Sequence, residues 1–392
     1  MLRQGFLSEG DRVASTGLSL GRFRSLAAAA AMFSLFAAAE SRAADPFDMQ
    51  WRELASGVWV GERPVSYRSP VMTNTTVVIG KTGVLVFDAA GLAVQGERLV
   101  AKLAELTDRP ITHIAISHWH GDHSMGDYAV LEKFPAAEVI SHEFTARYIA
   151  SPNGDRVEPR DLKAEAEYKA RVEKALETGV RSDGTPVTPG MRAFYSGLLA
   201  DFDIVNREIE RREVTRPTRT MTDRLVLDLG GRTAELRHIA PGNTKGDMFL
   251  WLPAEKILAT GDIVVRPTPY GFFSYPRSWA GVLRELKTLG ATQIVPGHGE
   301  IMNDTAYLDL LAETMDLVAT QVDAAVKAGK TLDETRAAMD WSTVGSRFTG
   351  GDDGMLPVLF DIWFKTPIVE AQYNLSSGKD NESLEASEPP AT

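Results

Sequence analysis

The chain has 392 residues, of which 44% are hydrophobic, and its formal net charge is -11 at pH 7. This length allows one large domain or two ordinary ones with a sizeable core, whereas the acidic balance argues against a nucleic-acid partner and a polybasic membrane-surface role. The sequence contains no cysteine, which excludes disulfides, thiolate metal ligands and a cysteine nucleophile.

The N-terminal segment has the pattern of a secretory signal. Arg22 precedes an alanine-rich apolar run over residues 26–39, and Ser41 and Ala43 are small residues at the two positions that a signal peptidase needs. The apolar run is too short to span a bilayer as a helix. We therefore expect residues 1–43 to be a signal peptide, the protein to be secreted or periplasmic, and no stable membrane anchor.

The main domain is expected over residues 44–375, and its first part reads as a strand meander followed by a βαβ unit. The strands are short and rich in β-branched residues, with glycine where they join. The helix carries leucines at helical spacing. The predicted strands cover residues 57–63, 74–80, 83–88, 111–117 and 137–141, and the predicted helix covers residues 93–106.

Residues 145–213 differ in character, because charges are dense there and alternate in sign. Helical patterns run over about 160–177 and 190–212, and a Gly/Pro turn at 180–190 separates them. We interpret this segment as a helical insertion. Both a solvated spacer and a lid over an active site are compatible with it.

The part of the chain after the insertion repeats the arrangement of strands and helices. Two such halves stacked sheet to sheet would carry helices on both outer faces. The tail, residues 376–392, is polar and acidic with two prolines, and we expect it to be disordered. The predicted strands are 223–229, 233–240, 247–253, 256–260 and 292–295, and the predicted helices are 277–289 and 304–328.

Four residues of metal-ligand type fall within six positions, directly after the apolar strand 111–117: His118, His120, Asp122 and His123. The first two can point the same way from an extended turn, and the other two can face a second point nearby. This spacing suits two adjacent metal ions. The alternative is a chance polar loop, but such residues rarely cluster in this way without a metal. Histidine and carboxylate ligands suit zinc or a harder metal.

The hexapeptide His-Trp-His-Gly-Asp-His that begins at His118 resembles the HxHxDH signature of the metallo-β-lactamase superfamily. Further segments resemble the family's motifs in the same order. Asp88 resembles the early aspartate that braces the metal loop, Asp262 the strand-end aspartate that bridges two metals, and His298 the last ligand histidine. The resemblance covers about residues 52–300. It implies an α/β fold, a four-layered αββα sandwich with the site on one edge, here with a helical insertion.

The resemblance also implies a ligand set for each of two ions. One metal would take Asp122, His123 and His298, with Asp262 as the bridge. The other would take His118 and His120, together with a third histidine at a position that Asn243 occupies in this chain.

Asn243 is a departure from the family pattern, because an amide oxygen is a weaker zinc ligand than imidazole. The first metal is therefore expected to bind loosely, to be absent, or to be completed by water, so the cofactor is one or two Zn²⁺ ions. His238 on the preceding strand is an alternative ligand, although a structural role suits it as well. Asn243 is either a turn residue that bonds its own loop or a residue that contacts the metal or the substrate.

A zinc ion lowers the pKa of its bound water from about 15.7 to near 7, so hydroxide is available at neutral pH. Asp122, a ligand beside that water, is the expected catalytic residue that orients it or accepts its proton. The segment after Asp262 is rich in aromatic residues. Tyr270 and Phe272 are therefore candidates for substrate binding in an apolar pocket wall, with core packing of the following helix as the alternative.

These residues predict a β-lactamase-like, metal-dependent hydrolase of an amide, lactam, lactone or ester bond that acts through zinc-bound hydroxide on a small-molecule substrate. One alternative is a thioester hydrolase of the glyoxalase II kind, although export argues against a substrate from a cytoplasmic thiol pool. The other is a non-catalytic, metal-binding accessory protein, which would fit the departure at Asn243. The sequence does not predict the oligomeric state.

Overall fold

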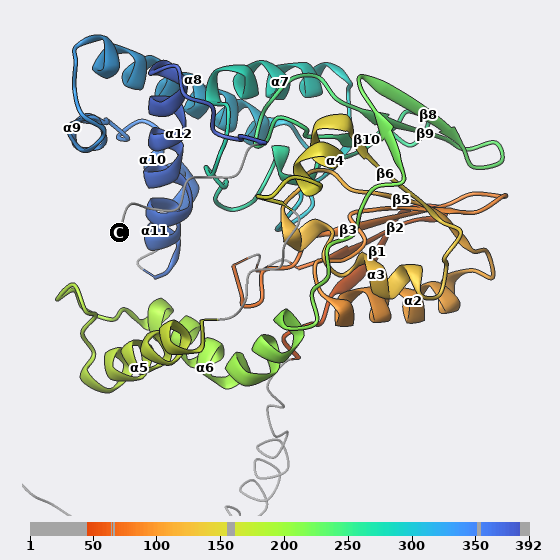
Figure 1. The fold of residues 1–392 in the computed structure, drawn as a ribbon, viewed down its shortest axis with the longest axis horizontal. Coiled ribbons are helices and arrows are strands. Elements are labelled where there is room, and N and C mark those ends of the chain that lie inside the picture. The colour runs from red at the N-terminus through yellow and green to blue at the C-terminus, as the bar shows by residue number, and fades with distance from the viewer. Residues whose placement is uncertain (1–44, 64, 66, 155–160, 351–353, 385–392) are drawn as a thin grey trace, which may run out of the picture. The chain divides into compact units, whose positions relative to one another are not determined.

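The fold is seen in a computed structural model that describes residues 45–63, 65, 67–154, 161–350 and 354–384 (Figure 1). The predicted signal peptide, residues 1–43, lies outside the described residues. Two β-sheets form the centre of the unit that begins at Pro46. No helix in the described part of the chain is long and apolar enough to cross a membrane.

The first sheet has seven strands in chain order, from β1 to β7. Strands β1 to β4 form an antiparallel meander, whereas β4 to β7 pair in parallel. The change of direction follows from the connections, since parallel neighbours need a crossover such as a helix. The strands are β1 (Gln50–Ala55), β2 (Val58–Glu62), β3 (Thr75–Ile79), β4 (Val84–Phe87), β5 (Ile111–Ala115), β6 (Glu138–His142) and β7 (Arg219–Met221).

The second sheet has five strands in the order β12-β11-β10-β9-β8. Strands β8, β9, β10 and β11 pair with one another in antiparallel fashion, and β12 pairs with β11 in parallel. The carboxyl ends of β11 and β12 therefore meet at one edge of this sheet. The strands are β8 (Arg224–Asp228), β9 (Thr233–Arg237), β10 (Phe249–Leu252), β11 (Ile257–Ala259) and β12 (Gln293–Val295).

The alternation of side chains along each strand determines the layers. On β3, Val78 lies in the core between the two sheets, whereas its neighbour Val77 packs under the helices on the outer face. The same holds on β4 for Leu85 and Val86. Successive side chains of a strand point to opposite faces, so two adjacent apolar residues serve two different cores.

Helices cover the outer face of each sheet, which completes an αββα sandwich and confirms the expected fold class (Figure 1). Helix α2 (Ala93–Leu106) and the short α3 (Asp127–Leu131) lie against the first sheet. Helices α7 (Pro276–Thr288) and α8 (Ala306–Lys327) lie against the second. The fully buried Trp279 of α7 donates its indole N–H to the carbonyl of Ile263 at 3.0 Å, which satisfies its polar atom inside the core.

The charged segment folds as helices between the neighbouring strands β6 and β7. Helix α4 (Glu143–Ile149) is followed by α5 (Leu162–Thr178) and α6 (Pro189–Ile209), close to the two helical ranges that the sequence predicts. Helix α6 begins with the Thr188 side chain accepting a hydrogen bond from the backbone N–H of Met191, an N-terminal cap. Its Val205 packs with residues of the main sandwich, which ties the insertion to that body.

A set of C-terminal helices that the sequence does not predict packs beside α8. They are α9 (Leu332–Ala338), α10 (Gly345–Thr349), α11 (Leu356–Leu359), the π-helix η3 (Phe360–Lys365) and α12 (Thr366–Ser376). The chain beyond Ser376 does not match the expected disorder over its first part, because residues 380–383 form specific hydrogen bonds with the main domain. Residues 385–392 of the predicted tail lie outside the described residues.

Candidate metal centre and substrate cavity

The loop after β5 carries the four clustered ligand candidates. The carboxylate of Asp88 accepts the backbone N–H of Ser117 at 2.8 Å, and the loop then closes into the 3-10 turn η1 (Gly121–His123). A close approach supports this turn, since a Cβ on Gly91 would lie 2.2 Å from the carbonyl oxygen of Asp122. Glycine is therefore required where the neighbouring chain passes under the loop.

Two further ligand candidates come from the second sheet. Asp262 lies in the 3-10 turn η2 (Gly261–Ile263) after β11, and His298 follows β12. The parallel pairing of these strands brings the two residues to the same edge. A Cβ on Gly297 would lie 2.1 Å from Asp262 Oδ1, so the glycine makes room for the carboxylate. Sequence order alone does not show this contact.

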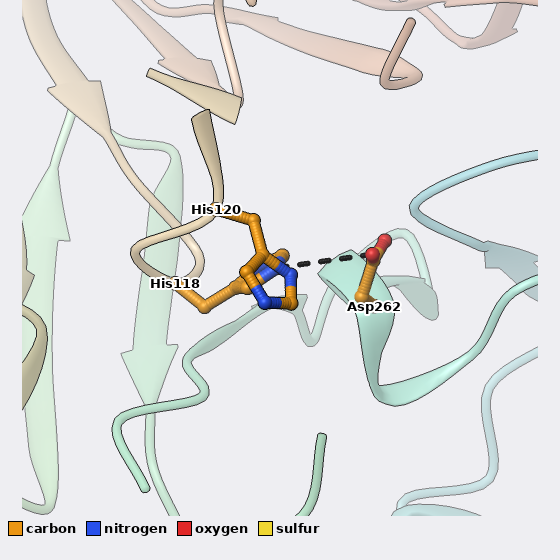
Figure 2. Close-up of side chains that lie close together, drawn as sticks. All are labelled: His118, His120 and Asp262. Atoms are coloured by element: carbon orange, nitrogen blue, oxygen red, sulfur yellow. Dashed lines mark hydrogen bonds and ion pairs between the residues drawn. The ribbon is translucent and has the colours of Figure 1, made fainter. Parts of the chain in front are cut away.

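His118, His120 and Asp262 form the first group of converging side chains (Figure 2). His118 Nε2 lies 2.8 Å from His120 Nδ1 and 3.7 Å from Asp262 Oδ2. The two imidazole rings meet edge to face, with centroids 4.5 Å apart. These three side chains therefore present ligand atoms to one point.

Asp122, His123 and His298 form the second group. His298 Nε2 lies 3.1 Å from Asp122 Oδ2 and 3.3 Å from His123 Nε2. Asp262 Oδ1 is 3.3 Å from His123 Nε2 and 3.4 Å from His298 Nε2. The two oxygens of Asp262 thus face different groups, which is the arrangement that a bridging carboxylate requires.

The chemistry of these side chains fits a bound cation. Neither oxygen of the buried Asp262 has a hydrogen-bond partner among the described residues, although a buried carboxylate without a partner is costly. Burial opposes a charge on His123, yet Asp262, Asp88 and Asp122 raise its pKa well above the ordinary value. Desolvation would raise the pKa of Asp122, but His123 and His298 bring it well below its usual range. The cluster therefore favours positive charge at its centre.

A ring of outer contacts orients three of the histidines. His123 Nδ1 lies 2.9 Å from Asp88 Oδ2, and His118 Nδ1 lies 2.9 Å from Ser117 Oγ. His298 Nδ1 lies 3.0 Å from the carbonyl oxygen of Met72. In each case the Nε2 atom remains directed at the centre, as metal-binding histidines require. Asp88 is thus placed where the resemblance expected a bracing aspartate.

Asn243 is fully buried, and neither atom of its side-chain amide has a hydrogen-bond partner among the described residues. Its loop precedes β10, and the backbone N–H of Met248 at the end of that loop donates to the carbonyl of Ser117 at 2.8 Å. Asn243 does not line the cavity beside the metal loop. Asn243 is buried, as His118 and His123 are, and this burial disfavours the predicted contact with a substrate in the cavity.

His238 is placed in a structural arrangement. Its ring stacks on His142 with centroids 4.1 Å apart, and its Nδ1 lies 2.7 Å from the carbonyl oxygen of Asp247. Burial lowers the pKa of His142 to about 4. The stacked pair thus packs under the loop that carries Asn243, and His238 is not in either group of converging ligands.

A cavity of about 740 Å³ opens over the metal loop, and most of its surface is apolar. His120, Asp122 and Asp262 line this cavity, and so do Tyr270 and Phe272, the two aromatic candidates for substrate binding. The Tyr270 ring lies 5.4 Å from that of His298, and its buried hydroxyl has no hydrogen-bond partner among the described residues. Further lining residues are Ser69, Pro70, Val71, Trp119, Gly121, Met125, Asn153, Gly154, Val205, Ile209, Arg212, Phe273 and Trp363.

Three contributors to this region are absent from the sequence predictions. Arg212 follows α6 and reaches the cavity, and Trp363 reaches it from the π-helix η3. Glu382, from the predicted tail, accepts a hydrogen bond from Trp119. Trp119 is a conspicuous aromatic residue within the metal loop, but no pattern in the sequence connects it with Glu382, which lies 263 positions away.

An αββα sandwich with histidine and aspartate groups at one sheet edge defines a class of metallohydrolase folds. The model of the metallo-beta-lactamase superfamily matches residues 68–298. The chain therefore belongs to this superfamily, as the sequence resemblance predicts.

Two of the similar proteins are alkylsulfatases. A linear primary-alkylsulfatase from Pseudomonas sp. is 22% identical over 275 residues, which cover 64% of this chain and 47% of that protein. The solved structure of the inverting sec-alkylsulfatase Pisa1 from Pseudomonas sp. matches with a TM-score of 0.56 and 15% identity, over 85% of this chain and 51% of that one. This chain therefore spans about half the length of each.

A metallo-beta-lactamase from Pontibacter korlensis is also similar, with a TM-score of 0.46 and 17% identity over 68% of this chain and 99% of that one. At 15% identity, the likeness to the sec-alkylsulfatase structure concerns the fold alone.

Proposed function

We propose that this protein is a zinc-dependent hydrolase that cleaves an ester-type bond in a small anionic molecule with an apolar part, and that a sulfate ester is the foremost candidate. The observation that carries this proposal is the convergence of six histidine and aspartate side chains, three of which line a largely apolar cavity. The amide, lactam, lactone and carboxylic ester bonds considered from the sequence are the competing substrates. The similarity to alkylsulfatases supports the choice of sulfate esters.

His118, His120 and Asp262 would hold one ion, and Asp122, His123 and His298 would hold the other, with Asp262 shared. Zinc bound there would supply hydroxide from water at neutral pH and stabilise negative charge on the substrate. The histidine and carboxylate donors agree with zinc preferences. One or two ions can be accommodated, and Asn243 decides how firmly the first is held.

The chain's own residues would orient the reactants. The side chain of Asp122 is 21% exposed and faces the cavity, so one oxygen can accept a proton from an attacking water while the other contacts His298. The buried hydroxyl of Tyr270 can donate a hydrogen bond to the oxygen of a leaving group. Burial, followed by the charges of Asp262 and Asp122, raises the pKa of Tyr270 well above its ordinary value, so this hydroxyl keeps its proton.

Arg212 supports an anionic substrate. It is a cationic side chain among the residues that line the cavity, and its Nε–H donates to the carbonyl of Gly91 at 3.2 Å. Among the described residues, no carboxylate lies within salt-bridge distance of it. A guanidinium anchored at Nε offers its remaining N–H groups as a fork, which suits a sulfate or carboxylate group.

The apolar part of the substrate would lie on the aromatic wall. Phe272 and Phe273 are 38% and 46% exposed, respectively, at the side of the cavity. Trp363 also lines the cavity, and its ring centroid lies 5.3 Å from that of Tyr270. An alkyl or aryl group that covers these rings would remove apolar surface from water, which favours binding.

The direct test is turnover by the zinc-loaded protein lacking residues 1–43. The panel should contain an alkyl sulfate, an aryl carboxylic ester, a lactone, a chromogenic cephalosporin and S-acyl glutathione. We expect the highest kcat/KM on the alkyl sulfate and loss of activity in Asp122→Ala. Asp333→Ala, which changes a carboxylate that is 93% exposed on α9, is the matched control and should keep full activity. The proposal fails if no ester of the panel is hydrolysed at full metal loading.

The same panel separates the alternatives. Preference for S-acyl glutathione would indicate a glyoxalase II-like thioester hydrolase. Tight metal binding without turnover, even after Asn243→His, would indicate a metal-binding accessory protein, the alternative that the unpartnered amide of Asn243 favours.

The role of Arg212 can be tested by comparing KM for an anionic and a neutral substrate. Arg212→Gln should raise KM for an anionic ester about tenfold or more, because a hydrogen bond to a charged group contributes about 1.5–3 kcal/mol. KM for a neutral ester of similar size should stay unchanged. Arg211→Gln is the matched control, since the neighbouring Arg211 pairs with Glu97 and Glu208 at the surface. Equal losses on both substrates would contradict a role in anion recognition.

We also propose that the protein acts outside the cytoplasm. The signal-like pattern over residues 1–43 supports this location. Fractionation of cells that express the full chain would test it, with N-terminal sequencing of the exported form. A protein that stays in the cytoplasm with its first 43 residues intact would contradict the proposal.

A further inference from the structure

The C-terminal segment, residues 380–384, returns from α12 to the loops that build the metal centre. Asn381 Nδ2 donates to the carbonyl of Ser274 at 3.0 Å and to that of Ala371 at 3.1 Å. Asp380 accepts hydrogen bonds from Lys245 Nζ at 2.5 Å and from the hydroxyl of Tyr275 at 3.2 Å. The segment is therefore held by contacts on both sides.

Glu382 of this segment is 1% exposed and has a separate donor for each oxygen. Oε1 accepts the indole N–H of Trp119 at 2.5 Å, and Oε2 accepts the backbone N–H of Lys245 at 2.7 Å. A buried carboxylate that bridges two donors holds both in fixed positions, because releasing either would leave a buried polar group unpaired. Glu382 thus connects the loop of Trp119 with the loop of Lys245.

The loop of Trp119 carries two residues of the first metal group, and the loop of Lys245 carries Asn243. Trp119 stands between His118 and His120 in the sequence, and its ring packs edge to face on that of His120 with centroids 4.4 Å apart. On its other side it stacks on Tyr148 at 4.1 Å. Lys245 lies two positions after Asn243, the residue at the expected third ligand position. The orientation of Trp119 therefore bears on His120 and on the cavity wall together.

We propose that Glu382 is a positioning residue of the active site, which acts through Trp119 and the Lys245 backbone to hold His120 and the cavity wall in place. This proposal rests on the proposed function, because it assumes that the cavity binds substrate beside the metal. A carboxylate from the far end of the chain thereby completes a site whose metal loop lies in the first half of the sequence.

The test compares Glu382→Gln with Trp119→Phe and with the double variant. Glutamine keeps the shape of Glu382 but has one accepting oxygen, so it can serve one of the two donors. Phenylalanine keeps an aromatic ring against Tyr148 and His120 but lacks the N–H. The matched control is Asp380→Asn. Asp380 contacts Lys245 and Tyr275 and does not contact Trp119. Its Oδ1 also accepts the backbone N–H of Glu382 at 3.2 Å, a bond that the amide oxygen of asparagine can keep.

Two quantities are to be measured: zinc affinity by competition with a chromogenic chelator, and KM and kcat on the best substrate. We expect Glu382→Gln to weaken the looser zinc site about tenfold, the effect typical of changes beside metal ligands, and to raise KM more than it lowers kcat. In the Trp119→Phe background the same substitution should have little further effect, because the shared contact is already lost.

The proposal is overturned if Glu382→Gln lowers only the Tm, or if Asp380→Asn produces the same loss of zinc affinity, since either result would make the segment a plain anchor of the C-terminus. If Glu382→Gln does not fold, Trp119→Phe alone must reproduce the weaker zinc site, and unchanged zinc affinity in that variant also overturns the proposal. The chelator measurement needs no turnover, so it decides this question even if the panel of substrates fails.

Discussion

At the scale of single residues, the amide of Asn243 is the feature that we propose limits metal loading. It is buried and without a hydrogen-bond partner among the described residues, in a loop beside the metal-binding turn. Because its oxygen is a weaker zinc ligand than an imidazole nitrogen, the group formed by His118 and His120 should hold zinc less firmly than the group around His123.

Asn243→His should therefore increase the amount of tightly held zinc. We expect fewer than two zinc ions per chain in the wild type and more in the variant, measured by elemental analysis after dialysis against a weak chelator. Asn303→His, which adds an imidazole at an exposed position outside both ligand groups, is the control and should leave the zinc content unchanged. Full loading with two ions in both wild type and Asn243→His would contradict this account of Asn243.

Gly297→Ala should damage the site through a close contact. The added Cβ would lie 2.1 Å from Asp262 Oδ1 and so displace the shared carboxylate. We expect a loss of about 1–3 kcal/mol in the free energy of unfolding, as for other overpacked positions, together with weaker zinc binding. Urea unfolding and chelator competition measure the two effects.

Gly281→Ala is the matched control for this substitution. Gly281 lies in α7 with no atom within 4 Å of an added Cβ, so alanine should be neutral or slightly stabilising there. If Gly297→Ala retains wild-type zinc affinity, the proximity of Gly297 to Asp262 does not matter for the site.

At the scale of elements, the sequence predicts most strands and the long helices, but neither the edge strands β1 and β7 nor the short C-terminal helices. Strands such as β3 and β4 have dense β-branched residues, and α2 and α7 have several turns of periodic apolar residues. By contrast, α10 has five residues and η3 is a π-helix. Segments of that kind are too short for a 3.6-residue period to be recognised, and their order comes from packing on α8.

Phe364 tests how far the π-helix depends on that packing. Its side chain is 0% exposed in the core of the second sheet, whereas Ile362 in the same turn is 50% exposed. Phe364→Ala should reduce the free energy of unfolding by about 3–5 kcal/mol, and Ile362→Ala should change it by less than about 0.5 kcal/mol. Chemical denaturation measures both, and similar values for the two variants would contradict the assigned burial.

At the scale of the whole molecule, the candidate metal centre takes its side chains from loops of both sheets. The loop with His118 and His123 follows the first sheet, whereas Asp262 and His298 follow strands of the second. The hexapeptide itself indicates a metal site by spacing alone. The participation of Asp262 and His298 came from resemblance to a family, because nothing in local patterning shows which distant loops converge. Arg212 and Glu382 escaped prediction for the same reason.

Removal of the metal should therefore destabilise the whole domain. Without a cation, the carboxylates of Asp88, Asp122 and Asp262 lie close together around buried histidines. We expect chelation to lower the Tm and added zinc to restore it, since an ion present at about 100 times its Kd stabilises the folded state by about 2.7 kcal/mol. A scanning calorimetry experiment with and without chelator measures the shift, and an unchanged Tm would show that no stabilising ion binds.

The junction between β7 and β8 has a practical consequence. Met221 ends the first sheet and Arg224 begins the second, so a cut at this point would give two fragments, each with an incomplete set of ligands. Zinc should then promote reassociation of the two fragments, because neither fragment alone contains all the ligand residues. The C-terminal fragment with the substitution His298→Ala should reassociate poorly in the presence of zinc. Reassociation of the fragments would therefore measure metal binding without knowledge of the substrate.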